Sequence, residues 1–247
     1  MSILTLTSAQ RAASVVLDAA QMARVDQHTT AHYGVGLLQM MENAGRGLAR
    51  LARQRFLQGD AHGATVHVLA GTGGNGGGVL AAARRLHGWG ARVQVWVPQP
   101  QRLGIVTAQQ WASLSHLGIV RGDAAAVGRG ADLVLDGLLG YSLRGNPSRP
   151  LAGLMETVAS GTAPVLAMDL PSGLHPDTGA LSQPTLAATA TLTLAAPKRG
   201  LLAAAARAWV GELYLADIGV PPVVYTDLGL SGDMSAVFAQ DDLVRWM

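Results

Sequence analysis

Apolar residues recur at helical spacing in the first quarter of the chain. They predict one helix through Val15–Val25 and a second over Leu37–Phe56, with a break at His32–Gly36. The N-terminal part of the chain is therefore expected to be helical, ahead of a different pattern.

From about residue 59 onward, short apolar runs alternate with stretches of helical spacing. Such alternation is typical of successive βαβ units around a parallel sheet with helices on both faces. The pattern therefore predicts an α/β protein with a mostly parallel central sheet. The expected strands are Ala64–Ala70, Arg92–Val97, Asp132–Asp136, Pro164–Asp169, Ala187–Leu194 and Glu212–Ile218, and the expected helices among them are Val79–His87 and Thr107–Leu117.

The length of the chain permits one large domain or two small ones. It has 247 residues, compared with roughly 100 to 200 residues in a typical domain, and no linker rich in serine, threonine or proline divides it. We expect a single domain over residues 1–247, with a helical part at 1–58 and an α/β core at 59–247.

The amino-acid composition excludes several kinds of functional site. The chain contains no cysteine, which excludes a disulfide framework, a thiol nucleophile and a thiolate metal site. Apolar residues make up 49% of the sequence and charged residues 14%, which is enough to bury a large core. Because we find no run of about 18 apolar residues and no secretory signal, we expect a cytoplasmic protein with no membrane partner.

Charge gives a misleading first impression. The isoelectric point of about 9.4 suggests a nucleic-acid partner, yet the formal net charge is only +2 and Lys198 is the only lysine. The arginines are scattered, whereas binding to a phosphate backbone needs a clustered basic stripe. We therefore expect no nucleic-acid partner.

Candidate chemistry gathers in three segments that follow predicted strands, namely Gly71–Gly78, Asp136–Gly140 and Asp169–Gly173. Ligands of open parallel sheets bind outside the carboxyl ends of the strands, so we expect these segments to face one crevice. The first segment is glycine except at Thr72 and Asn75, which leaves backbone amides open to an anion at the start of a helix. The alternative is a tight turn that needs glycine for positive φ angles.

Two common nucleotide sites fit this segment poorly. A conventional NAD dehydrogenase places an acidic residue about 20 positions after its glycines, and no acidic residue occurs between Asp60 and Asp123. A Walker phosphate loop needs a lysine within the loop, and the only lysine lies far away in the sequence. The sequence therefore disfavours an ordinary NAD oxidoreductase and excludes a Walker-type site.

The strand-terminal aspartates Asp136 and Asp169 have two interpretations. Either residue alone is more often a cap of the following turn or helix, but their expected position beside one glycine segment favours a functional role. Asp136, the Asn75 amide oxygen and the Ser172 hydroxyl are hard oxygen donors, which suit a hard cation and suit zinc poorly. A carboxylate shielded from water is also able to exchange a proton with a substrate hydroxyl.

Several motifs occur together in an order that resembles the NAD(P)H-hydrate epimerase family, also called the YjeF N-terminal domain. The resemblance implies a Rossmann-like three-layer α/β/α sandwich with a mostly parallel central sheet and N-terminal helices. It also implies an enzyme that interconverts the R and S forms of hydrated NADH and NADPH, damaged cofactors with a hydroxyl on the nicotinamide ring. The motifs extend over nearly the whole chain and are Met40–Gly45, the glycine segment continuing into Ala82–Leu86, Asp132–Gly140, Met168–Gly173, and Ala190–Leu194 leading to Pro197 and Lys198.

The resemblance assigns roles to individual positions. Asp169 would contact the hydrated ring, and we expect it to be the catalytic acid/base. A potassium ion would be held by Asn75, Asp136 and Ser172, with backbone carbonyls completing its shell. The substrate would be bound by two further groups of residues, Gly74, Asn75, Gly76, Gly77 and Gly78 and then Gly140, Tyr141, Ser142, Leu143, Arg144, Gly145 and Asn146.

The glycine segment departs from the family's usual G-N-N-G-G-D-G. Gly74, Gly78 and Val79 stand where the first asparagine, the aspartate and the last glycine are usual. Side chains that would orient hydroxyl groups of the substrate are therefore missing. This departure keeps open a second function, that of a nucleotide-binding or scaffolding protein that has lost catalysis on the same fold.

The family also implies partners. We expect a homodimer with the N-terminal helices at its interface, and a functional partner, a kinase-like NAD(P)H-hydrate dehydratase, either fused to this chain or separate.

Three further residues have both a site interpretation and a structural one. Glu42 and Asn43 lie in a predicted helix, where packing or capping is the alternative to a site role. Lys198 follows a predicted strand and is either a site residue or a solvated loop charge.

Overall fold

The computed structural model describes residues 3–119, 121–141 and 145–247. Among these residues, eight strands form one sheet in the order β1-β8-β7-β6-β5-β4-β2-β3. Neighbouring strands run parallel except for the antiparallel pair β7 and β8. The strands are β1 (Leu4–Thr5), β2 (Thr65–Ala70), β3 (Arg92–Trp96), β4 (Leu133–Gly137), β5 (Val165–Met168), β6 (Ala190–Leu194), β7 (Glu212–Ala216) and β8 (Leu243–Arg245).

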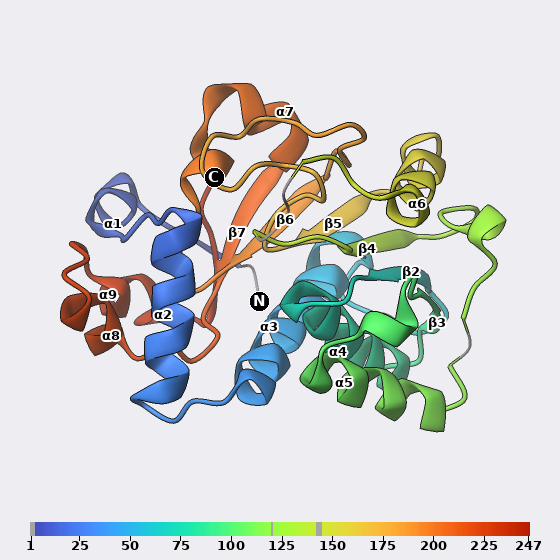
Figure 1. Cartoon of the computed structure of the whole chain (residues 1–247), viewed down its shortest axis with the longest axis horizontal. Helices are drawn as coiled ribbons and strands as arrows, with labels where there is room; N and C mark the ends of the chain where they lie inside the picture. The colour runs from blue at the N-terminus through green and yellow to red at the C-terminus, as the bar shows by residue number, and fades with distance from the viewer. Residues whose placement is uncertain (1–2, 120, 142–144) are drawn as a thin grey trace.

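Helices cover both faces of this sheet (Figure 1). Successive side chains of a strand point to opposite faces. Val68 and Leu135 accordingly belong to the core cluster that includes residues of α3 (Leu37–Leu51) and α4 (Gly74–Gly88), whereas Leu69 and Val134 pack in a second cluster with Met155 of α6 (Arg149–Ala159). The helices are α1 (Ser8–Ala13), α2 (Ala19–Ala31), α3 (Leu37–Leu51) with a π-helical extension (Ala52–Phe56), α4 (Gly74–Gly88), α5 (Ile105–His116), α6 (Arg149–Ala159), α7 (Arg207–Val210), α8 (Pro222–Asp227) and α9 (Met234–Phe238).

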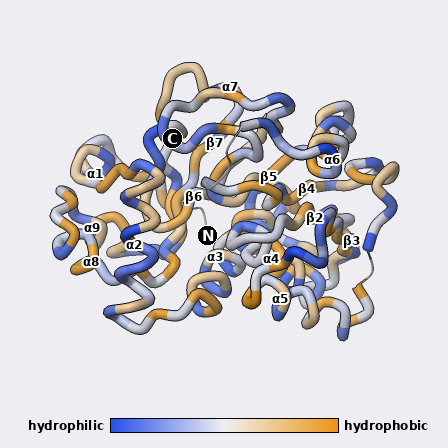
Figure 2. Tube along the Cα trace, in the orientation of Figure 1, coloured by the Kyte–Doolittle hydropathy of each residue, from blue (hydrophilic) through white to orange (hydrophobic). Residues whose placement is uncertain are grey.

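The expected α/β architecture with a mostly parallel sheet and helices on both faces is confirmed. Hydrophobic residues are concentrated along the central strands (Figure 2), as a sheet buried on both faces requires. Within the described ranges, no helix combines the length and the apolar character that crossing a membrane would need. Four helices, α6, α7, α8 and α9, and two strands, β1 and β8, were not predicted from the sequence. The short strand β1 lies in the part expected to be helical and pairs with β8.

The first predicted helix is wrong over its first turn. Thr7 and Asp18 each form an N-terminal capping box, so two separate helices, α1 and α2, begin there. The apolar residues between them are extended, because the Leu17 amide donates to the Pro197 carbonyl and the Arg199 amide donates to the Leu17 carbonyl, both at 2.9 Å. A long-range contact therefore overrides the local helical spacing.

The predicted loop through Gly78 is also wrong, because α4 already begins at Gly74. Glycine is a poor helix former, so the first turn of α4 could not be recognised from the sequence. Close helix packing explains its presence: a Cβ atom on Gly77 would lie 2.5 Å from Met41 Sδ, and one on Gly78 would lie 2.8 Å from Met168 Cε.

Candidate functional site

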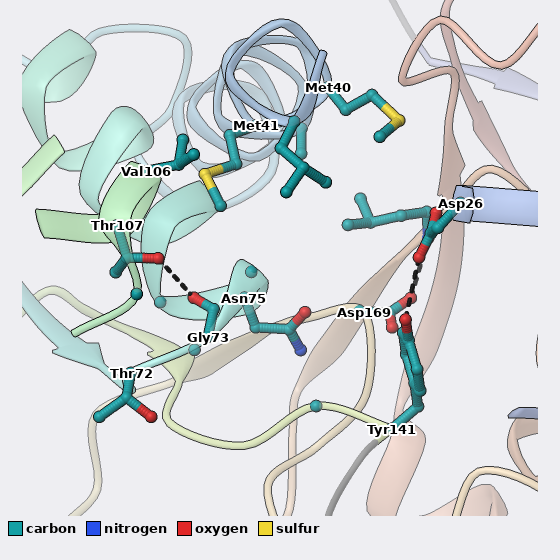
Figure 3. A pocket seen from close by; sticks show the side chains of 18 of the residues that line it. Asp26, Met40, Met41, Thr72, Gly73, Asn75, Val106, Thr107, Tyr141 and Asp169 are labelled. Carbon is teal, nitrogen blue, oxygen red and sulfur yellow. Dashed lines mark hydrogen bonds between the residues drawn. The ribbon is translucent and has the colours of Figure 1, made fainter. Parts of the chain in front are cut away.

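A cavity of about 890 Å³ opens at the carboxyl ends of β2, β4, β5 and β6 (Figure 3). This is the position at which open parallel sheets bind ligands. Its wall combines residues that follow these strands with residues of α2, α3 and α5. The lining residues are Met22, Asp26, Leu37, Met40, Met41, Ala44, Thr72, Gly73, Gly74, Asn75, Gly76, Gly104, Ile105, Val106, Thr107, Gly137, Leu138, Leu139, Gly140, Tyr141, Asp169, Leu194, Lys198 and Ile218.

Two helices begin at this cavity. α4 follows Gly73 and α5 follows Gly104, and neither N-terminus receives a hydrogen bond from a capping side chain. The Gly104 amide donates to the Thr72 carbonyl and Thr107 Oγ1 donates to the Gly73 carbonyl, each at 3.0 Å, so the two starts are held together. Uncapped amides and the positive end of each helix dipole make this end of the cavity suited to an anion.

The glycines of the segment serve different purposes. None of the glycines between residues 71 and 78 has a positive φ angle, so the tight-turn interpretation is wrong. A Cβ atom on Gly76 would lie 2.0 Å from the Gly71 carbonyl oxygen, and one on Gly71 would lie 1.9 Å from the Leu138 carbonyl oxygen. Gly74, in contrast, has no atom within 4 Å of such a Cβ. Close backbone packing therefore fixes Gly71 and Gly76, whereas Gly74 faces open space.

Asp169 projects into the cavity from a strained turn at the end of β5. Its φ angle is +67°, in the left-handed region that non-glycine residues seldom occupy, and the Leu170 amide donates to the Met168 carbonyl around it at 2.8 Å. Ala195, after the neighbouring β6, has a similar φ of +61°. Such strain gathers at functional sites, and here two adjacent strand ends share it.

Lys198 fixes the Asp169 carboxyl group. Lys198 Nζ donates to Asp169 Oδ1 at 2.5 Å, and the Leu194 amide and Thr193 Oγ1 donate to the same oxygen at 3.2 Å. The Lys198 side chain is only 1% exposed, so its interpretation as a solvated loop charge is wrong. The contact with Leu17 described above positions the segment that carries this lysine.

A second carboxyl group, that of Asp26 on α2, lines the same cavity and was missed by sequence reasoning. Tyr141 donates its hydroxyl hydrogen bond to Asp26 Oδ2 at 2.9 Å (Figure 3). Burial raises the pKa of Asp26, and the charge of Asp169 raises it further, while the Tyr141 hydrogen bond and Lys198 lower it. A lone acidic residue on an amphipathic helix gives no sequence signal, because only the fold brings α2 to the strand ends.

Asp136 does not face the cavity, contrary to expectation. It is fully buried, and its carboxylate accepts hydrogen bonds from the Ser172 amide at 2.8 Å, the Ser172 hydroxyl at 2.6 Å and the Leu138 amide at 3.2 Å. The Ser172 hydroxyl in turn accepts from the Leu139 amide. These contacts join the turns after β4 and β5 beneath the cavity floor.

The three predicted potassium ligands lie around this junction. Asn75 Nδ2 donates to the carbonyls of Met168 and Leu139, at 2.9 and 3.2 Å, and Leu139 connects this amide group to Ser172. Burial raises the pKa of Asp136, and no positively charged side chain of the described residues forms an ion pair with it. The Asp136 carboxylate, the Ser172 hydroxyl oxygen and the carbonyl oxygens of Leu139 and Met168 near Asn75 are oxygen donors of the kind that a potassium ion binds.

Potential metal sites of another kind are missing from the described ranges, since no group of three or more histidine, aspartate or glutamate residues there is able to hold a metal ion. The oxygen donors around Asp136 include a single carboxylate. Such hard oxygen donors suit a hard cation and suit zinc poorly.

Apart from Asp169, which lines the cavity, the predicted substrate-binding residues divide into four groups. Gly74, Asn75, Gly76, Gly140 and Tyr141 line the cavity. Gly77 and Gly78 face neighbouring methionines, as described above. Gly145 and Asn146 bond instead to the segment at residues 182–183, the Gly145 carbonyl accepting from Ser182 Oγ and Asn146 Oδ1 accepting from the Gln183 amide. Ser142, Leu143 and Arg144 lie outside the described residues.

Glu42 and Asn43 take part in helix packing. Glu42 accepts hydrogen bonds from Arg84, Arg85 and Gln110, which connects α3 to α4 and α5. Asn43 Nδ2 donates to the Ile218 carbonyl at 3.1 Å. Their contacts support the walls of the cavity, and neither residue lines it.

Fold and cavity together place the protein among the α/β proteins that bind a ligand at the carboxyl ends of parallel strands, with an acidic residue held there by a buried lysine. Residues 37–200 match the family model described as YjeF-related protein N-terminus. The chain belongs to this family. Asp26 precedes the matched segment.

Known proteins of similar sequence carry related names. The chain is 40% identical over 237 residues to a protein named NAD(P)H-hydrate epimerase from Dehalogenimonas lykanthroporepellens, with 96% of this chain and 95% of that protein covered. It is 37% identical to a bifunctional NAD(P)H-hydrate repair enzyme from Salinibacter ruber, of which it covers 41%. The chain thus spans the length of the first relative and less than half of the second.

A solved structure has the same fold. The crystal structure of the yeast protein ynu0 superposes with a TM-score of 0.79 and 23% identity, covering 93% of this chain and 99% of that one. At this level of identity the similarity establishes the fold alone.

Proposed function

We propose that this protein catalyses the interconversion of the R and S forms of hydrated NADH and NADPH. The observation that carries the proposal is the carboxyl group of Asp169, which Lys198 holds at the cavity by Oδ1 while Oδ2 makes no hydrogen bond within the described residues. Epimerisation inverts a carbon that bears a hydroxyl group beside a ring nitrogen. Whether the hydroxyl leaves and returns or the ring opens, a proton must be exchanged at that oxygen. Asp169 is the acid/base for this exchange.

The remaining cavity suits a dinucleotide. Its volume of about 890 Å³ lies within the range of ordinary ligand pockets. The N-termini of α4 and α5 provide amides for the diphosphate, and apolar side chains such as Met40 and Met41 provide surfaces for the rings. Gly74, which has no side chain, leaves the space in front of the α4 N-terminus open for the diphosphate.

The proposal includes a potassium ion held by Asn75, Asp136 and Ser172. When bound, the ion supplies a positive charge beside the buried carboxylate of Asp136. The residues themselves keep the turn after β4 in place, because Ser172 and Asp136 bond to the amides of Leu138 and Leu139, and this turn leads directly to Gly140 and Tyr141 at the cavity.

The enzymatic proposal has a direct test. Both epimers of hydrated NADH are mixed with the protein and with a dehydratase that consumes only one epimer, in potassium and in sodium buffers. Complete consumption faster than spontaneous epimerisation supports the proposal. If consumption stops at the usable epimer and the remainder disappears at the background rate, the protein is the binding or scaffolding protein that the altered glycine segment also permits.

Potassium binding is testable without measuring activity. Because a ligand that binds only the folded state stabilises it by mass action, potassium is expected to raise the thermal midpoint of the wild type by several degrees relative to sodium. Asp136→Asn removes the only carboxylate of the set, so its midpoint is expected to be the same in both salts. Equal midpoints for the wild type in potassium and sodium would contradict the ion site.

The proposal extends to the assembly and the location of the protein. By similarity to the bifunctional repair enzymes, it acts together with an NAD(P)H-hydrate dehydratase. We further propose a homodimer with the N-terminal helices at its interface, in the cytoplasm. Light scattering is expected to give twice the chain mass of 25.5 kDa, and a monomer at micromolar concentration would contradict the dimer.

A further inference from the structure

Asp26 gives the cavity a second carboxyl group that the reaction described above does not use. It projects from α2 toward the side of the cavity that also carries Tyr141 and Asp169 (Figure 3). Tyr141 binds Oδ2, while Oδ1 has no hydrogen bond within the described residues. Each of the two aspartates therefore has one oxygen held by the protein and one left for a ligand.

The two carboxyl groups have opposite electrostatic partners. Asp169 is ion-paired with Lys198, whereas no cationic side chain of the described ranges forms an ion pair with Asp26. Desolvation disfavours the charged form of a carboxyl group, as does a nearby negative charge, and both act on Asp26. The surroundings of Asp26 favour its protonated form, which suits an acid, and the ion pair of Asp169 favours its carboxylate form, which suits a base.

We propose that Asp26 is a second catalytic residue, which donates a proton to the ring nitrogen of the hydrated nicotinamide while Asp169 accepts the proton of the hydroxyl group. This inference rests on the proposed epimerase function and assigns the two halves of its proton exchange. The carboxyl groups of Asp26 and Asp169 lie on the same side of the cavity (Figure 3). The hydroxyl group and the ring nitrogen are bonded to the same carbon, so two carboxyl groups on one side of the cavity are able to reach both.

The step is ring opening followed by closure. The hydroxyl proton moves to Asp169, the electron pair of that O–H bond forms a C=O bond, and the bond between this carbon and the ring nitrogen breaks. The electron pair of the broken bond remains on the nitrogen, which takes the proton of Asp26. After rotation of the aldehyde, the nitrogen attacks its other face, returns the proton to Asp26, and the oxygen recovers its proton from Asp169. No oxidant or reductant is needed.

Several groups control the protonation of Asp26. Tyr141 faces it from the segment after β4, Asp169 from the end of β5, and Lys198 from the segment after β6, while the buried Tyr225 of α8 lies within electrostatic range. The hydrogen bond from Tyr141 stabilises the carboxylate form and so lowers the pKa of Asp26. Tyr141 is thus a positioning residue, which sets the orientation and the proton affinity of the acid.

The first experiment compares the wild type with Asp26→Asn, Asp26→Glu and Asp227→Asn in the coupled epimerase assay. Asp26→Asn is expected to lower kcat at least 100-fold with a small change in KM, because proton transfer by one group contributes roughly that factor. Asp26→Glu is expected to recover part of the loss. Asp227, which pairs with His28 of α2 outside the cavity, is the matched control, and its replacement is expected to leave kcat unchanged.

The second experiment measures the pH profile of kcat for Tyr141→Phe. Because Asp26 must carry a proton, the rate falls on the alkaline side as that proton is lost. Removing a donor that stabilises the carboxylate raises the pKa of Asp26, so the alkaline limb is expected to shift to higher pH. A role of Tyr141 in binding alone would change KM and leave this limb in place.

A third measurement follows the oxygen atom. In water labelled with heavy oxygen, ring opening retains the original oxygen during inversion, whereas loss and return of the hydroxyl group introduces the label. Incorporation at every inversion would overturn the ring-opening step. A folded Asp26→Asn protein with wild-type kcat would overturn the role of Asp26 alone, whereas a wild type without accelerated epimerisation would overturn the proposed function itself.

Discussion

Replacement of Asp169 by asparagine is expected to lower kcat for epimerisation by about 100- to 10,000-fold, the usual contribution of a general acid/base. The structure adds a second expected effect. Asp169 and Lys198 are 2% and 1% exposed, and removing one partner of a buried ion pair leaves the other charge uncompensated, at a cost of about 3–5 kcal/mol. The variant is therefore expected to unfold at lower denaturant concentration as well as to lose activity. Coupled assays and urea unfolding measure the two effects separately.

The double variant Asp169→Asn, Lys198→Met distinguishes chemistry from stability. Because the methionine carries no charge, the free energy of unfolding is expected to recover most of the loss seen in the single variant. The activity is expected to remain at the level of the single variant. Recovery of epimerisation in the double variant would show that Asp169 acts only through the fold, and unchanged turnover of Asp169→Asn would remove it from the mechanism.

The second large effect is expected for Gly76→Ala. The added Cβ atom would lie 2.0 Å from the Gly71 carbonyl oxygen and 2.9 Å from the Gly71 nitrogen. These are backbone atoms, which cannot move aside without disturbing β2 and the start of α4. We expect a loss of about 3 kcal/mol or more in the free energy of unfolding, at the upper end of overpacking effects, measured by urea denaturation.

Gly74→Ala is the matched control in the same turn. Its Cβ atom would have no neighbour within 4 Å, so the free energy of unfolding is expected to change by less than about 0.5 kcal/mol. Equal destabilisation by the two substitutions would mean that the turn tolerates no side chain at all, and the distinction between packed and open glycines would be wrong.

The positions of most strands could be predicted because each is marked by a short run of apolar residues that are neighbours in the sequence. Compact apolar runs predicted six of the strands to within a few residues, and the strand ends identified Asp136 and Asp169. β1 and β8 escaped prediction because they are only two and three residues long. Such short strands at one side of the sheet depend on their partners, β8 for β1 and β1 and β7 for β8, more than on their own sequence.

The start of α4 in the glycine segment could not be predicted from the local sequence. Its composition indicated a loop ahead of a helix starting at Val79, because glycine disfavours a helix by about 1 kcal/mol per residue. The structure nevertheless begins α4 at Gly74, because Met41 and Met168 occupy the space that side chains at Gly77 and Gly78 would fill. Packing between α3, α4 and β5 therefore selects the glycines and the helix together.

The α/β class, the three segments at the strand ends and the family of the chain can be recognised from the order of the amino acids, because each depends on residues close together in the chain. Which side chains meet at the cavity depends instead on how the sheet and its helices pack. This packing buries Lys198 against Asp169, turns Asp136 away from the cavity and brings Asp26 from the N-terminal part to the same wall. Contacts between residues more than a hundred positions apart, such as that of Asp26 with Tyr141, leave no periodic pattern in the sequence, because they arise only when the sheet and its covering helices have assembled.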